Sequence, residues 1–103
     1  MDRLQMLQDL LAQDPNNQLA RYGLGMEYSG KGEVESAIAE FKKLVEINPN
    51  YANAYFMAAQ TLAKAERADE AKQLLRQGIT AAARTGNSHA QSEMQAFLDE
   101  LEY

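Results

Sequence analysis

QLARYGLGMEYSGKGEVESAIAEFKKLVEINPNY, residues 18–51, is the stretch that decides the fold of this chain. It ends in the turn signal Asn48-Pro49-Asn50, and a similar signal, Asp14-Pro15-Asn16, precedes it, so that the two prolines lie 34 residues apart. Shifting the sequence by this offset places small residues on small ones and apolar residues on mostly apolar ones: Gly25 on Ala59, Tyr28 on Leu62, Ala37 on Ala71 and Phe41 on Leu75. A fixed period of this length is typical of helical hairpins stacked in an array.

Helical periodicity supports the same interpretation. At about 100° per residue, the apolar residues of the stretch that follows Gly32 fall on one stripe: Val34, Ala37, Ile38, Phe41, Leu44 and Val45. A later stretch has a matching stripe: Ala68, Ala71, Leu74, Leu75, Gly78, Ile79 and Ala82. Small residues such as Gly25 allow two helices to approach closely, while Tyr28 and Phe41 fill the space beside them.

Residues 18–51 resemble a tetratricopeptide repeat, whose pattern reads W-x2-L-G-x2-Y, then A-x3-F, then P. The matching positions are Leu24, Gly25, Tyr28, Ala37, Phe41 and Pro49, and only the Trp position differs, because Arg21 stands there. Residues 52–85 are similar to a weaker second copy, in which Ala83 replaces the final Pro. The resemblance implies an all-α fold of antiparallel helical hairpins, stacked as a short right-handed solenoid of about six helices.

The expected organisation is one domain over residues 1–103. It comprises an N-terminal capping helix within 1–15, repeat 1 at 18–51, repeat 2 at 52–85 and a C-terminal capping helix within 86–103, since a repeat array needs caps on its apolar ends. The helices are predicted near 3–14, 17–30, 33–47, 52–65, 68–85 and 89–102. Gly86 is interpreted as a helix stop, and Ser88 to Gln91 as a capping box that begins the last helix.

Composition excludes several classes of function. The chain has 15 acidic and 10 basic residues, a net charge of −5, which argues against nucleic acid and against an anionic membrane surface as partners. It has no Cys, so disulfides, thiol catalysis and Cys-ligated metals are excluded. The first residues do not resemble a signal peptide, and no apolar run approaches the roughly 20 residues of a membrane span. A cytoplasmic location is expected.

Candidate catalytic groups do not converge in the sequence. His89 is the only His, and with Glu93 four residues later it supplies too few ligands for a metal site. Paired carboxylates such as Asp69 and Glu70 suit the positive end of a helix dipole. Gly30-Lys31-Gly32 is a turn between two helices and not a phosphate loop, because no strand precedes it. The chain is therefore expected not to be an enzyme, with no cofactor and no metal.

A second apolar stripe in the first repeat points to a binding surface. Leu19, Tyr22 and Met26 have the spacing i, i+3, i+7 and lie opposite the face that the repeat pattern assigns to packing. In tetratricopeptide-repeat proteins the first helices of successive repeats line a concave surface, so the resemblance implies one groove shared by both repeats. The predicted partner-binding residues are Leu19, Tyr22, Met26, Asn53, Phe56, Gln60 and Lys64. The predicted function is a non-catalytic protein–protein interaction module that binds a peptide or helix of a partner in this apolar groove.

Two alternatives remain open from the sequence. A terminal helix could cover the stripe and make it ordinary core. The same surface could instead join two copies of the chain, so a monomer or a weak homodimer is expected. The family's grip on a C-terminal carboxylate is not expected here, because Lys64 is the only clear cation near the surface. If the stripe is core, the next candidate is the basic face of Arg67, Lys72 and Arg76.

Overall fold

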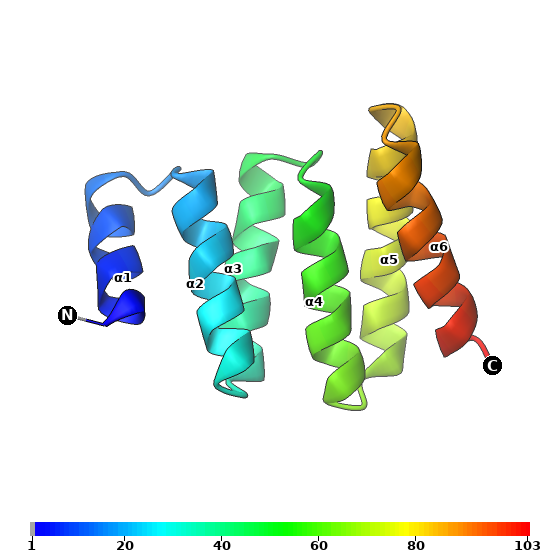
Figure 1. The fold of residues 1–103 in the computed structure, drawn as a ribbon, viewed down its shortest axis with the longest axis horizontal. Coiled ribbons are helices and arrows are strands. Elements are labelled where there is room, and N and C mark those ends of the chain that lie inside the picture. The colour runs from blue at the N-terminus through cyan, green and yellow to red at the C-terminus, as the bar shows by residue number, and fades with distance from the viewer. Residues whose placement is uncertain (1) are drawn as a thin grey trace.

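A computed structural model describes residues 2–103, and over that range the chain forms six α-helices and no strand. They are α1 (Arg3–Gln13), α2 (Gln18–Gly30), α3 (Val34–Ile47), α4 (Ala52–Lys64), α5 (Ala68–Arg84) and α6 (Ser88–Leu101). Every predicted helix boundary lies within one residue of the observed one. Figure 1 shows the helices side by side in chain order, with the two termini at opposite ends of the array. The predicted all-α arrangement of stacked hairpins is confirmed.

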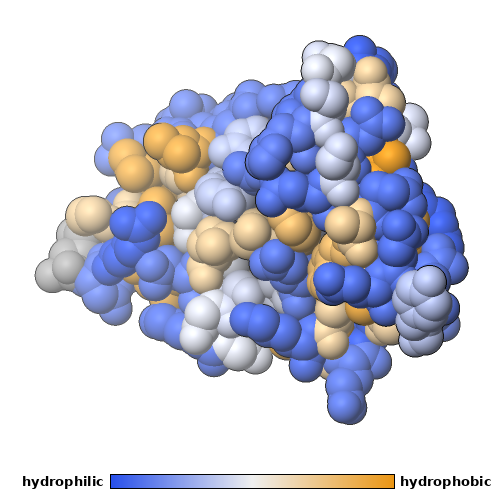
Figure 2. Space-filling model, turned by 45° about the vertical axis from the view of Figure 1, so that its right-hand side comes forward, coloured by the Kyte–Doolittle hydropathy of each residue, from blue (hydrophilic) through white to orange (hydrophobic). Residues whose placement is uncertain are grey.

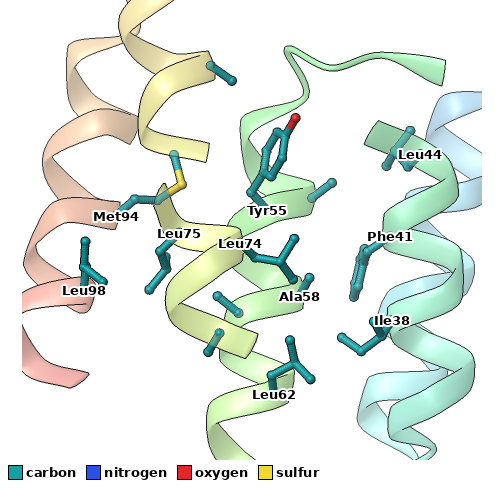
Figure 3. Packing of buried hydrophobic residues seen from close by; sticks show 14 of the residues in the cluster. Ile38, Phe41, Leu44, Tyr55, Ala58, Leu62, Leu74, Leu75, Met94 and Leu98 are labelled. Atoms are coloured by element: carbon teal, nitrogen blue, oxygen red, sulfur yellow. The ribbon is translucent and has the colours of Figure 1, made fainter. Parts of the chain in front are cut away.

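The main hydrophobic core lies between the second helix of one hairpin and the hairpin that follows. Figure 3 shows Phe41 and Ile38 of α3 directed toward Ala58 and Leu62 of α4. The largest fully buried side chains of this core are Phe41, Leu44, Leu62, Leu75 and Met94. Met94 belongs to α6, so the last helix packs on α5 and covers the C-terminal end of the core.

Close helix approach depends on two glycines. A β-carbon added at Gly25 would lie 2.6 Å from Cε1 of Phe41, and one added at Gly78 would lie 2.7 Å from Cβ of Tyr55. Such distances are well inside van der Waals contact, so only a residue without a side chain fits at either position. The predicted role of Gly25 in packing is confirmed, and Gly78 has the equivalent role between α5 and α4.

The first helix has a smaller core of its own. Leu7 of α1 is buried together with Ala20 and Leu24 of α2, and Leu4 and Leu11 pack at the edge of this cluster. Among the described residues α1 contacts only α2, whereas α3 lies between α2 and α4. One side of α1 is therefore left uncovered.

The helix ends follow two patterns. At the ends of α2, α4 and α5 the chain turns through a left-handed residue: Gly32 (φ 76°), Glu66 (φ 62°) and Gly86 (φ 70°). After Gly86, the Asn87 N–H donates to the Ala82 carbonyl at 2.8 Å and closes the turn, which confirms the predicted helix stop.

The predicted capping box at Ser88 is wrong. The side chain of Asn87 caps α6 by accepting a hydrogen bond from the Ala90 N–H at 3.1 Å. Ser88 is already the first helical residue, because the turn at Gly86 leaves Asn87 in the non-helical conformation that a cap requires.

Replacing Glu66 by Gly is expected to raise the free energy of unfolding by about 0.5–1 kcal/mol. Glu66 lies one period after Gly32 and adopts the same left-handed conformation, which costs a residue with a β-carbon about 1–2 kcal/mol. The greater chain entropy of Gly in the unfolded state offsets part of this gain. Urea unfolding measures the change, and Gly32→Ala is the matched control, with an expected loss of similar size. A lower midpoint for Glu66→Gly would contradict the assignment of strain to this turn.

Candidate functional site

The described residues, 2–103, contain no group of three or more His, Cys, Asp or Glu side chains placed to hold a metal ion. His89 Nε2 lies 3.2 Å from Glu93 Oε1, and both side chains are largely exposed on one turn of α6. Within the same range, no helix is long and apolar enough to cross a membrane. The features that remain are surfaces of the helical array.

An apolar hollow of about 530 Å³ lies between α1 and α2. Its walls are formed by Arg3, Leu7, Leu10, Asn17, Leu19, Ala20, Tyr22, Gly23 and Met26; we call it the α1–α2 groove. Leu19 is 74% exposed, Leu10 44% and Met26 39%. Large apolar side chains gathered around a hollow are unusual on the surface of a charged protein and are typical of an interaction site.

Tyr22 lies at the base of the α1–α2 groove and belongs partly to the core. Its ring centroid is 6.1 Å from that of Phe41 and 5.6 Å from that of Tyr51. Burial raises the pKa of the Tyr22 phenol, and the neighbouring Tyr51 hydroxyl adds to the rise. Tyr22 therefore joins the groove to the core beneath it, whereas Leu19 and Met26 project outward.

The predicted residues of the second repeat lie apart from the α1–α2 groove. Asn53 is exposed, while the half-buried Phe56 packs against Phe97 of α6, with ring centroids 6.0 Å apart. Gln60 and Lys64 line a second hollow of about 420 Å³, together with Ala63 and Phe97. The last helix thus covers part of the α4 stripe, as one of the sequence alternatives proposed, and leaves the α2 stripe open.

The surface view agrees with this division. Figure 2 shows hydrophobic residues gathered toward the N-terminal side of the array, at the left, and hydrophilic ones prevailing toward the C-terminal side. Sequence reasoning had named Leu19 and Met26 but missed Leu7, Leu10 and Phe97 as neighbours of the two hollows. A signal was available, since the period of 34 places Leu10 on Leu44, a position that needs cover.

The basic face at α5 is neutralised by acidic partners. Arg67 forms ion pairs with Glu35 of the preceding hairpin and with Glu70, the latter at 2.8 Å. The hydrogen bonds from Arg67 hold the pKa of the Glu70 carboxyl below its usual value. Arg76 pairs with Glu102 at 3.4 Å. These cations already have partners within the chain, which makes this face a weaker candidate than the α1–α2 groove.

Comparison with known proteins gives consistent results. Residues 28–96 match the family model described as tetratricopeptide repeat. The chain is 32% identical over 96 residues to a TPR repeat-containing protein of Pseudomonas aeruginosa, an alignment that covers 93% of this chain and 91% of that protein. The solution structure of a Bordetella parapertussis protein superimposes with a TM-score of 0.83 at 26% identity and covers 99% of this chain and 89% of that one. The TPR2B domain of yeast Sti1, solved in complex with pHsp70, superimposes with a TM-score of 0.87 over 96% of this chain and 79% of that one; at 17% identity this likeness concerns the fold.

Proposed function

Because the chain belongs to the tetratricopeptide-repeat family, whose fold generally mediates protein–protein interaction, we propose that it binds a segment of a partner protein in the α1–α2 groove. The observation that carries the proposal is the open apolar cluster of Leu10, Leu19 and Met26 around the hollow of about 530 Å³. Apolar anchors of this kind contribute most of the binding energy in protein interfaces when a partner removes them from water. The proposed role is non-catalytic, in keeping with a family of generally non-enzymatic interaction modules.

The proposed surface extends from α2 onto α4. Asn53, Gln60 and Lys64 would supply polar contacts to a partner that continues past Met26, with Phe56 and Phe97 beneath them. Two hydroxyls hold α2 and α4 together, since Ser29 Oγ and Thr61 Oγ1 are 2.8 Å apart. The proposal takes residues 18–51 and 52–85 as the two repeats that present this surface, and the Sti1 domain solved with pHsp70 supports a peptide as the kind of ligand.

Self-association through the α1–α2 groove is the rival proposal. Two copies would each bring a net charge of −5 to the interface, and like charges oppose such an approach. We therefore expect a monomer. Sedimentation over a wide range of concentrations checks this, and a dimer dispersed by Leu19→Ser would favour the rival.

Replacing Leu19 and Met26 together by Ser is expected to weaken partner binding by about 2 kcal/mol or more, roughly 30-fold, because both side chains are anchors in the proposed groove. Stability should change by less than about 0.5 kcal/mol per site, since both project into solvent. Tyr22 is left intact because its loss would also disturb the core. The chain is used as bait in the native extract, its partner is identified by mass spectrometry, and its affinity is then measured by titration.

Tyr103→Ser is the matched control, because Tyr103 is a fully exposed aromatic residue at the other end of the array. The control should bind like the unaltered chain. A partner that binds the double variant with unchanged affinity would refute the proposed groove, whereas a double variant that unfolds would assign Leu19 and Met26 to the core.

A further inference from the structure

Helix α1 occupies the place of α3 in a preceding repeat. One period of 34 residues relates Leu7 to Phe41 and Leu10 to Leu44. The residues that follow the two helices have the same conformation: Asp14 has φ −141° and ψ 91°, and Asn48 has φ −139° and ψ 92°. In both, the backbone N–H donates to the carbonyl of the residue four positions earlier. The equivalence therefore holds in sequence and in geometry.

The equivalent positions differ in exposure. Leu44 is 0% exposed, whereas Leu10 is 44% exposed. The difference arises because α3 is covered by α2 on one side and by α4 on the other, while α1 contacts α2 alone. The side of α1 that is left open corresponds to the side of α3 on which α2 packs. The α1–α2 groove lies at this position.

We propose that the α1–α2 groove accepts an amphipathic α-helix of a partner protein, which packs on α1 as α2 packs on α3 and carries basic residues beside its apolar stripe. This inference rests on the proposed function and specifies the form and the charge of the ligand. The 11 residues of α1 span about 16 Å, so about three turns of a partner helix cover the groove. A helix satisfies its own backbone hydrogen bonds, which suits a groove lined mainly by apolar side chains.

The charges around the groove select a basic partner. Asp2 and Asp9 lie four and three residues from Met6, a half-exposed residue of α1, and Asp14 lies four residues from Leu10. Residues at these spacings are neighbours on a helix surface. The cation at the groove, Arg3, is paired with Glu27 at 2.8 Å. The surroundings are thus acidic, and Lys or Arg beside the apolar stripe of the ligand would complement them.

Three synthetic peptides of about 14 residues test the inference. The first keeps Leu24 and Tyr28 from the face that α2 presents to α3, has Ala in place of Gly25 because Leu7 is smaller than Phe41, and has Lys at the solvent-facing positions. The second has Glu at those positions, and the third is the Lys peptide with a central Pro. Affinity is measured by calorimetry and helix formation by circular dichroism, at low and at high salt.

The Lys peptide is expected to bind and to become helical. The Glu peptide should bind about tenfold more weakly at low salt, with a smaller difference at high salt, and the Pro peptide should not bind, because Pro breaks the helix. Leu10→Ser should weaken binding of the Lys peptide by about tenfold or more, and Tyr103→Ser should leave it unchanged.

The outcomes separate this inference from the proposed function. Equal binding of the Lys and Pro peptides, still lost in Leu10→Ser, would mean an extended ligand and would overturn the helical occupant while the proposed groove stands. Failure of the Lys peptide, with native-partner binding still dependent on Leu19 and Met26, would likewise overturn only the inference. Stronger binding of the Glu peptide would overturn the basic flank. Binding unaffected by Leu10, Leu19 or Met26 would overturn both.

Discussion

Replacing Phe41 by Ala is expected to lower the free energy of unfolding by about 3–5 kcal/mol. The Phe41 side chain is 1% exposed and belongs to the main core, where Tyr22 lies against it and Gly25 faces it across the α2–α3 contact. Its removal leaves a cavity that the surrounding helices can fill only in part. The loss is a large share of the 5–15 kcal/mol or so that a typical domain possesses. Urea unfolding with an unchanged slope measures it.

Phe97→Ala is the matched control, because it makes the same chemical change at a half-buried ring on α6. It should cost less than half as much, since less apolar surface is lost from the interior. Equal losses at Phe41 and Phe97 would contradict the assignment of Phe41 to the centre of the core.

Gly25 provides an independent check on the same contact. In the unaltered chain Gly25→Ala is expected to cost about 1–3 kcal/mol, because its new β-carbon overlaps the Phe41 ring. In the Phe41→Ala background the same change should cost much less, since the methyl group enters the vacated space. Additive losses in the double variant would show that the two residues do not meet.

Replacing Glu40 by Ala is expected to cost about 3 kcal/mol, because it leaves the guanidinium of Arg21 buried without its counter-ion. Arg21 is 8% exposed, and its Nη1 lies 2.7 Å from Glu40 Oε1. Its Nη2 donates to the Pro15 carbonyl at 2.6 Å, and its Nε has no hydrogen-bond partner. The whole arrangement is therefore sensitive to the loss of the carboxylate. Thermal and urea unfolding measure the effect.

The exposed ion pair at the α1–α2 groove is the control for this prediction. Arg3 is 65% exposed in its pair with Glu27, and Glu27→Ala should cost less than about 1 kcal/mol. Replacing both members of the buried pair, by Arg21→Met with Glu40→Leu, should recover most of the stability, because no unpaired charge remains. If Glu40→Ala costs no more than Glu27→Ala, the Arg21–Glu40 pair does not hold α2 and α3 together.

The helices and the core were predictable from the sequence for a local reason. Helix ends depend on nearby turn residues such as Pro15, Pro49 and Gly86, and the buried stripe of α3 follows from helical spacing around Phe41. The repeat added a second reading of each position, since Phe41 and Leu75 occupy equivalent sites in successive hairpins. Where the prediction failed, at Ser88, two adjacent polar residues could each cap the helix, and the preceding turn selected Asn87.

The candidate site depended on contacts between distant parts of the chain. Helical spacing gives the direction of a side chain, and it placed Tyr22 and Phe56 on equivalent faces of α2 and α4. It does not say which other helix lies in that direction. In the tertiary structure Phe56 meets Phe97 of α6, and Tyr22 lies against Phe41 and Tyr51.

Arg21 illustrates the same division. The sequence showed only that Arg21 stands at a position where the family pattern has Trp, and its charge alone favours an exposed position. Folding brings Arg21 to Glu40 and to the Pro15 carbonyl, so that its charge is compensated inside the hairpin. The sequence by itself determined the repeat, its helices and the residues of its core, because these follow from local spacing. Only the tertiary structure decided that Phe56 is covered, that Arg21 is buried and that Leu10, Leu19 and Met26 are open, because exposure depends on which helices pack there.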